Sequence, residues 1–93
     1  KMSYGDYLGL DALLAAQKPL SRQHDERLFI VIHQVQELWM KLMAHEMALA
    51  MRHVAADELR HAFKATARIG RVQRQLIEAW DVLTTMTPHD YLA

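Results

Sequence analysis

A histidine at the end of an apolar run is the feature of this sequence best suited to chemistry. Residues 29–33 read Phe-Ile-Val-Ile-His and lie in a stretch, residues 24–53, that contains no Gly or Pro. Phe29 and His33 are four residues apart, so on a helix they stack on one face, one turn from each other. A second apolar stripe follows another face: Leu28, Val35 and Leu42. A helix that is apolar on two sides is buried from two directions or lines a pocket.

Two roles are open for His33. A core histidine whose ring nitrogens are satisfied by neighbours is the commoner case, since histidine is often partly buried. A polar ring set in an apolar pocket, beside an aromatic wall supplied by Phe29, would instead orient a ligand. Periodicity alone does not separate these two roles.

A second pattern, Glu58-x-x-His61, has the spacing used by carboxylate-bridged di-iron bundles. Such a site needs another copy of the motif and two further carboxylates. The chain holds one copy, so only a homodimer could complete the site. Glu58 also suits a first helical turn, where a carboxylate interacts favourably with the helix dipole. The remaining histidines do not have metal-ligand spacing, and we predict no metal site within the chain.

The apolar periodicity predicts an all-α bundle of three helices. The first covers residues 3–16 and stops before Pro19, and the second covers residues 24–53. The third begins at Asp57, a residue type favoured as N-cap, and continues to about residue 83. No strand-like alternation or internal repeat is present.

Two further signals concern helix packing and the end of the chain. Gly70 lies inside the third predicted helix, where it favours a close helix crossing. Thr87 and Pro88 have the residue types of an N-cap and a first helical position, which predicts the start of a fourth helix. We therefore expect residues 1–93 to be a piece of a longer protein.

Composition narrows the classes of function. Apolar residues make up 52% of only 93 residues, so a partner surface is expected to cover part of them. The formal net charge is zero, which argues against non-specific binding to nucleic acid or to anionic membrane. No cysteine is available for a disulfide or a thiolate ligand. The longest apolar run is five residues, too short for a membrane span, and we expect a cytoplasmic protein.

Three blocks of the chain resemble the N-terminal part of the tryptophan 2,3-dioxygenase family. The central block, residues 24–34, reads His-Asp-Glu-Arg-Leu-Phe-Ile-Val-Ile-His-Gln, and residues 37–42 continue it with Glu-Leu-Trp-Met-Lys-Leu. Residues 4–8, Tyr-Gly-Asp-Tyr-Leu, resemble the family's opening helix, and residues 80–88 resemble the segment that leads to its substrate-binding helix. The blocks are collinear, so the resemblance covers essentially the whole chain and about the first third of the family's usual length.

The resemblance implies an all-helical haem enzyme, in which residues 1–93 would be a single helical segment, the N-terminal part of a longer catalytic domain. Members of this family bind haem b and insert both atoms of O2 across the C2–C3 bond of the indole of L-tryptophan. The product is N-formylkynurenine, and the reaction is the first step of the kynurenine pathway. The family assembles as an intertwined homotetramer.

The resemblance also assigns roles to residues. His33 matches the distal histidine that accepts a hydrogen bond from the indole N–H, and Phe29 matches the aromatic wall beside haem and substrate. Tyr91 matches an aromatic position near the substrate carboxylate, and Trp80 aligns near the distal side of the haem. The remaining matched positions of the substrate-binding segment are Ile30, Val31 and Ile32.

Other parts of the family's active site come from elsewhere. Tyr4, Tyr7 and Leu8 match residues that reach across from a neighbouring subunit to cover the active site. The proximal histidine that binds haem iron, and the arginine that binds the substrate carboxylate, match no position in this chain. We therefore expect the chain alone to be inactive. The alternative is a non-catalytic helical module that serves oligomerisation or interaction with a partner.

Overall fold

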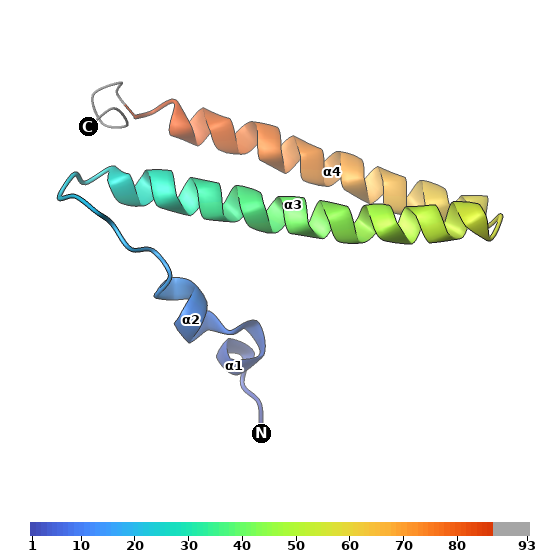
Figure 1. The fold of residues 1–93 in the computed structure, drawn as a ribbon, viewed down its shortest axis with the longest axis horizontal. Coiled ribbons are helices and arrows are strands. Elements are labelled where there is room, and N and C mark those ends of the chain that lie inside the picture. The colour runs from blue at the N-terminus through green and yellow to red at the C-terminus, as the bar shows by residue number, and fades with distance from the viewer. Residues whose placement is uncertain (87–93) are drawn as a thin grey trace.

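Two long antiparallel helices dominate the computed structural model, which describes residues 1–86 (Figure 1). Helix α3 spans Glu26–Ala55 and helix α4 spans Leu59–Leu83. Two short helices, α1 (Tyr4–Leu8) and α2 (Leu10–Leu14), precede them. The predicted all-α class is confirmed, since the described residues contain helices and turns but no strand.

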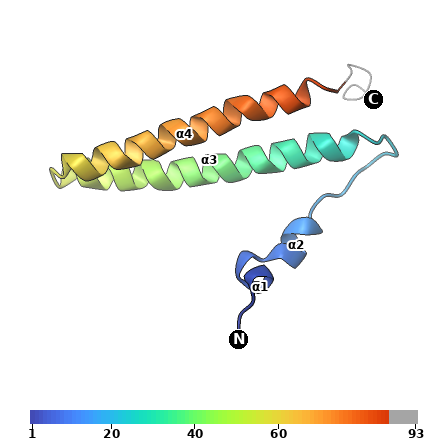
Figure 2. The same cartoon turned by 180° about the vertical axis from the view of Figure 1, so that it is seen from behind.

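The core lies between α3 and α4. Its buried apolar residues include Ile32 on α3 and Ala62, Ala65 and Val72 on α4. The two helices run close together near the turn that joins them and separate toward the other end, in both views (Figures 1 and 2). The two alanines lie near the turn, where small side chains let the helix backbones approach, and larger residues follow toward the separated end.

A single helical layer leaves much apolar surface uncovered. Phe63 and Ile77 on α4 are 69% and 70% exposed. Such surface is what the high apolar content led us to expect, because two helices cover only one stripe of each other. Within residues 1–86, no helix is both long enough and apolar enough to cross a membrane.

The single helix predicted for residues 3–16 is wrong, because Gly9 interrupts it. Gly9 has φ of +64°, in the left-handed region, and it ends α1 with its N–H bonded to the Asp6 carbonyl. Glycine takes this conformation without a steric penalty, so the chain changes direction there and α2 begins anew. The start of α1 follows a capping box. The Asp6 N–H donates to the Ser3 hydroxyl, and the Ser3 N–H donates to the Asp6 carboxylate.

The turn between the long helices also differs from its prediction. Asp57 is not the N-cap of α4, because it adopts φ of +59° inside the turn. Aspartate is among the few non-glycine residues that tolerate this region. Glu58 takes the N-cap position without a side-chain capping bond. The close crossing expected at Gly70 does not occur within residues 1–86, where no atom other than those of its own helical turns lies within 4 Å of the position that a Cβ would take. The helix start predicted at Thr87 lies outside the described residues.

The segment before α3 is held against that helix by hydrogen bonds of two side-chain amides and one carboxylate. Gln17 donates from Nε2 to Oε1 of Gln34 at 2.8 Å, and Gln34 donates from its own Nε2 to the Ala16 carbonyl at 3.1 Å. The Glu26 carboxylate accepts from the Leu20 N–H at 2.8 Å, and from the N–H and hydroxyl of Ser21 at 2.8 and 2.6 Å. These bonds set where the chain enters α3, one turn before Phe29.

The stability of the loop before α3 depends on pH through the Glu26 carboxylate. The hydrogen bonds from the Leu20 N–H, the Ser21 hydroxyl and the Ser21 N–H lower the pKa of the Glu26 carboxyl, in that order of size. A lowered folded-state pKa means that the stabilisation is complete above the ordinary glutamate pKa and is lost as pH falls through the lowered value. We expect Glu26→Gln to reduce the hydrogen-exchange protection of the Leu20 and Ser21 amides about fivefold at neutral pH.

A matched control is Glu37→Gln, which removes an exposed carboxylate of the same helix and should leave both amides unchanged. In the wild-type protein, the same two amides should lose protection on acidification below the ordinary glutamate range. Equal protection of both amides in the Glu26 and Glu37 variants would show that the carboxylate does not hold the loop.

Candidate functional site

Three aromatic rings meet at the end of the hairpin where α3 and α4 separate. The rings of Phe29 and His33 lie 4.2 Å apart between centroids and are tilted by 31°. The Trp80 ring, from α4, meets His33 edge-on at 5.9 Å and 80°. His33 and Trp80, 47 positions apart in the sequence, are thus in contact. Both pairs have the tilted or edge-to-face geometry that aromatic rings prefer.

These rings line an open cavity of about 230 Å³ together with Leu83 and Thr84. Sequence reasoning missed these last two residues, although the signal was present. Leu83 and Thr84 follow Trp80 by three and four positions, so they share its helix face. Thr84 uses its hydroxyl to donate to the Asp81 carbonyl at 2.6 Å, which leaves the wall largely apolar.

The hydrogen bonding of His33 determines which ring nitrogen can bind a ligand. Its Nδ1 lies 2.7 Å from the Phe29 carbonyl oxygen. A carbonyl can only accept, so in the neutral imidazole Nδ1 carries the proton and Nε2 is left as an acceptor. The ring is therefore held in one tautomer by its own helix. The cavity thus offers an aromatic wall and one acceptor for an N–H or O–H donor.

The isoleucines and valine that precede His33 do not line this cavity. Ile32 is buried against α4, Ile30 is half-buried, and Val31 is exposed in the described part of the chain. Val31 is two residues from both Phe29 and His33, which turns its side chain to the opposite side of the helix. The contacts with substrate assigned to Ile30, Val31 and Ile32 remain predictions.

The N-terminal aromatic residues lie outside the cavity too. Tyr4 and Tyr7 are each 77% exposed on α1, and Leu8 beside them is also exposed. Such exposure of two tyrosines leaves them available to another surface, and their assignment to a neighbouring subunit remains a prediction. Tyr91 lies outside the described residues.

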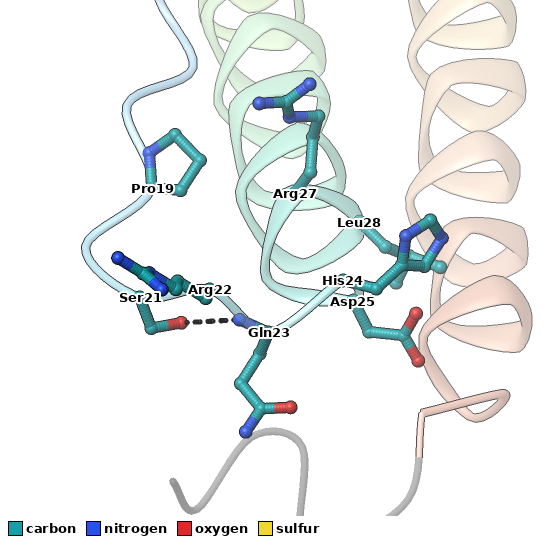
Figure 3. Close-up of a pocket in the computed structure, with 8 residues that line it drawn as sticks. All are labelled: Pro19, Ser21, Arg22, Gln23, His24, Asp25, Arg27 and Leu28. Atoms are coloured by element: carbon teal, nitrogen blue, oxygen red, sulfur yellow. Dashed lines mark hydrogen bonds between the residues drawn. The ribbon is translucent and has the colours of Figure 1, made fainter.

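A larger cavity, of about 550 Å³, opens at the loop before α3 (Figure 3). Most of its lining residues are of polar or charged types, among them Arg22, His24, Asp25 and Arg27. The Ser21 hydroxyl accepts from the Gln23 N–H and shapes this loop. None of the three aromatic rings lines it. The smaller cavity is therefore the better candidate for a ligand-binding site, because it combines an apolar wall with a single oriented polar group.

The Glu58-x-x-His61 motif is engaged in local contacts at the opposite end of the hairpin. His53 donates from Nδ1 to Oε1 of Glu58 at 3.0 Å, across the turn. His61 packs on His53 with ring centroids 5.0 Å apart. Within residues 1–86, no group of three or more histidine or acidic side chains is arranged to hold a metal ion. The contacts present tie the end of α3 to the start of α4.

Comparison with known proteins gives one consistent result. The sequence model of the tryptophan 2,3-dioxygenase family matches residues 1–93. A tryptophan 2,3-dioxygenase of Polaromonas sp. strain JS666 is 65% identical over 92 residues, which are 99% of this chain and 31% of that protein. The corresponding proteins of Exiguobacterium sibiricum and Bacillus thuringiensis are 58% and 54% identical, each over 98% of this chain and 33% of their own length.

The chain thus spans about a third of the length of the curated relatives it matches. The resemblance carried by the three sequence blocks is confirmed over the whole chain. Of the residues that line the aromatic cavity, Phe29 and His33 lie in the central block, and Trp80, Leu83 and Thr84 lie in the last block. On these grounds the chain belongs to the tryptophan 2,3-dioxygenase family.

Proposed function

We propose that the protein that contains this chain is a haem-dependent tryptophan 2,3-dioxygenase, which oxidises L-tryptophan with O2 to N-formylkynurenine. The observation that carries the proposal is the state of His33. A side chain that offers an acceptor nitrogen, is fixed by the Phe29 carbonyl and is set in an aromatic wall suits an indole. The indole has a flat apolar ring and one N–H donor, which together complement this wall.

In this proposal His33 positions the substrate. The indole N–H donates to Nε2 of His33, while the ring packs against Phe29 and meets Trp80 at its edge. Binding two features of the ring at once limits both its translation and its rotation, which is how positioning accelerates a reaction. The bond to the Phe29 carbonyl keeps the imidazole from rotating away from the substrate.

The same wall fits one face of haem b. A porphyrin is broad, flat and apolar, and the lining of the cavity is mostly apolar and aromatic, with one side open. Phe29 and Trp80 would contact the haem through their rings. When bound, haem supplies the dioxygen chemistry that amino-acid side chains lack. His33 would face the same space with its acceptor nitrogen and hold the substrate in place.

The rest of the proposed site lies beyond the described residues or in other subunits. We assign the proximal iron ligand and the carboxylate-binding arginine to the other two thirds of the protein. Tyr91 would lie near the substrate carboxylate. Tyr4, Tyr7 and Leu8 would cover the active site of a neighbouring subunit in a homotetramer, and their exposure on α1 supports this role. A cytoplasmic location remains a prediction from the sequence.

Turnover of L-tryptophan tests the proposal. The full-length protein, reconstituted with haem b, should convert L-tryptophan and O2 to N-formylkynurenine, detected by its absorbance. Residues 1–93 alone with added haem should be inactive, because the proposal assigns the axial ligand to the remainder. Absence of product from the haem-loaded full-length protein would contradict the dioxygenase assignment.

A second candidate is a helical interaction module without chemistry. The exposed apolar side chains of α4, among them Phe63 and Ile77, favour it, because such surface binds other helices. The two functions are distinguished by the same full-length protein. An interaction module would assemble through α4 and bind neither haem nor tryptophan.

A further inference from the structure

A buried glutamine connects α3 to α4 about one helical turn from the residues of the aromatic cavity. Gln36 is 5% exposed, and its Nε2 donates to the Leu76 carbonyl of α4 at 2.9 Å. Within residues 1–86, its Oε1 is buried and has no hydrogen-bond partner. The polar side chain is therefore held inside the helix interface by one bond to a backbone group.

The bond lies where close helix packing ends and the cavity begins. On α4 the buried Val72 precedes Leu76 by one turn, and Trp80 follows Leu76 by one turn. On α3 Gln36 follows His33 by three residues, which places both near one face. The distance between the two helices grows from their connecting turn toward the end of the hairpin that carries the cavity (Figures 1 and 2).

Apolar packing alone would leave the two helices freer to slide. Contacts between apolar side chains are non-directional, whereas a hydrogen bond requires a defined distance and angle. The Leu76 carbonyl is also the group to which the helical pattern assigns the Trp80 N–H. A bond from Gln36 to this carbonyl thus ties α3 to the helical turn that carries Trp80.

A glutamine at this buried position stabilises the helix interface less than an apolar side chain would, and this points to a positioning role. A methionine of similar length would fill the same space without burying an unpaired oxygen, and buried unpaired polar groups are destabilising. The Leu76 carbonyl does not depend on Gln36, since its helical partner would remain. Groups that oppose stability are commonly retained where function needs a fixed geometry.

We propose that Gln36 is a positioning residue: its bond to the Leu76 carbonyl fixes Trp80 against His33 and so sets the width of the slot that receives the substrate ring. The inference rests on the proposed function for the identity of that ring. The bond itself acts on the helices whether or not substrate is bound.

The test compares Gln36→Met with Gln75→Met in the full-length haem protein. Both variants replace a glutamine amide by a thioether, but Gln75 is exposed in the described part of the chain, one residue from Leu76. We expect Gln36→Met to raise KM for L-tryptophan about five- to tenfold, the scale of one hydrogen bond. Its kcat should change much less, and its Tm should be unchanged or higher. Gln75→Met should match the wild type.

Two results would overturn the inference. One is a KM for Gln36→Met within twofold of the wild type. The other is a rise in KM accompanied by a lower Tm and loss of haem, because this combination indicates a purely structural role. Retention of Tm with a raised KM supports positioning.

A readout that does not depend on turnover separates this inference from the proposed function. In protein labelled with 5-fluorotryptophan, the ¹⁹F resonance of Trp80 is identified by its loss in Trp80→Phe. It should shift in Gln36→Met and not in Gln75→Met. If the wild type fails to oxidise tryptophan while this resonance shifts, the dioxygenase proposal fails and the positioning role stands. An unshifted Trp80 resonance in Gln36→Met contradicts the positioning role directly.

Discussion

Replacement of His33 by alanine in the full-length protein is expected to lower kcat/KM for L-tryptophan about ten- to a hundredfold while haem remains bound. The loss has two sources. The substrate ring would lose its acceptor at Nε2, and it would lose the imidazole that packs 4.2 Å from Phe29. Neither contact involves the iron, whose ligand we assign to another part of the protein.

His45→Ala is the matched control, because His45 is an exposed histidine on the same helix. It should keep both turnover and haem. Haem content is read from the Soret absorbance per protein, and turnover from N-formylkynurenine formation. Loss of haem together with activity in His33→Ala would place His33 on the iron and not beside the substrate.

Arg68→Ala is expected to lower the free energy of unfolding by about 2–3 kcal/mol. Glu46 on α3 is a nearly buried carboxylate, with a side chain only 5% exposed, and Nη1 of Arg68 donates to its Oε1 at 3.0 Å. Removal of the arginine leaves this charge inside the helix interface without its partner. The Arg68 side chain is 53% exposed, so solvent moderates the loss relative to a fully buried pair.

Chemical denaturation of the full-length protein measures this change, with Arg71→Ala as control. Arg71 is an exposed arginine of the same helix, and its loss should change stability by no more than about 0.5 kcal/mol. Replacement of both partners, Glu46→Leu with Arg68→Met, should recover most of the loss, because no uncompensated charge remains. Equal stability of Arg68→Ala and Arg71→Ala would show that the ion pair contributes nothing to the docking of α3 on α4.

The periodic signals predicted the long helices and the pairing of Phe29 with His33 well. Both depend on local geometry, since residues four apart on a helix must share a face. The predicted start and end of α3, residues 24 and 53, differ by two positions from the observed Glu26 and Ala55. The first helix failed because one glycine in the left-handed region outweighed the apolar pattern on both sides of it.

Contacts between helices were harder to predict, because periodicity does not give the register of one helix against another. The approach of Trp80 to His33 and the bond from Gln36 to Leu76 depend on that register. The role of His33 stayed open for the same reason. Periodicity shows that an imidazole lies near a phenyl ring, but not which nitrogen is occupied by a neighbouring carbonyl.

The central claim is that Nε2 of His33 accepts a hydrogen bond from the indole N–H, and a substrate that lacks this donor tests it most directly. The ratio of kcat/KM for L-tryptophan to that for 1-methyl-L-tryptophan should be measured in the wild type and in His33→Ala. We expect a large preference for L-tryptophan in the wild type that falls about tenfold in His33→Ala, where no acceptor remains and the methyl group gains space. An equal preference in both proteins would show that His33 and the indole N–H do not interact.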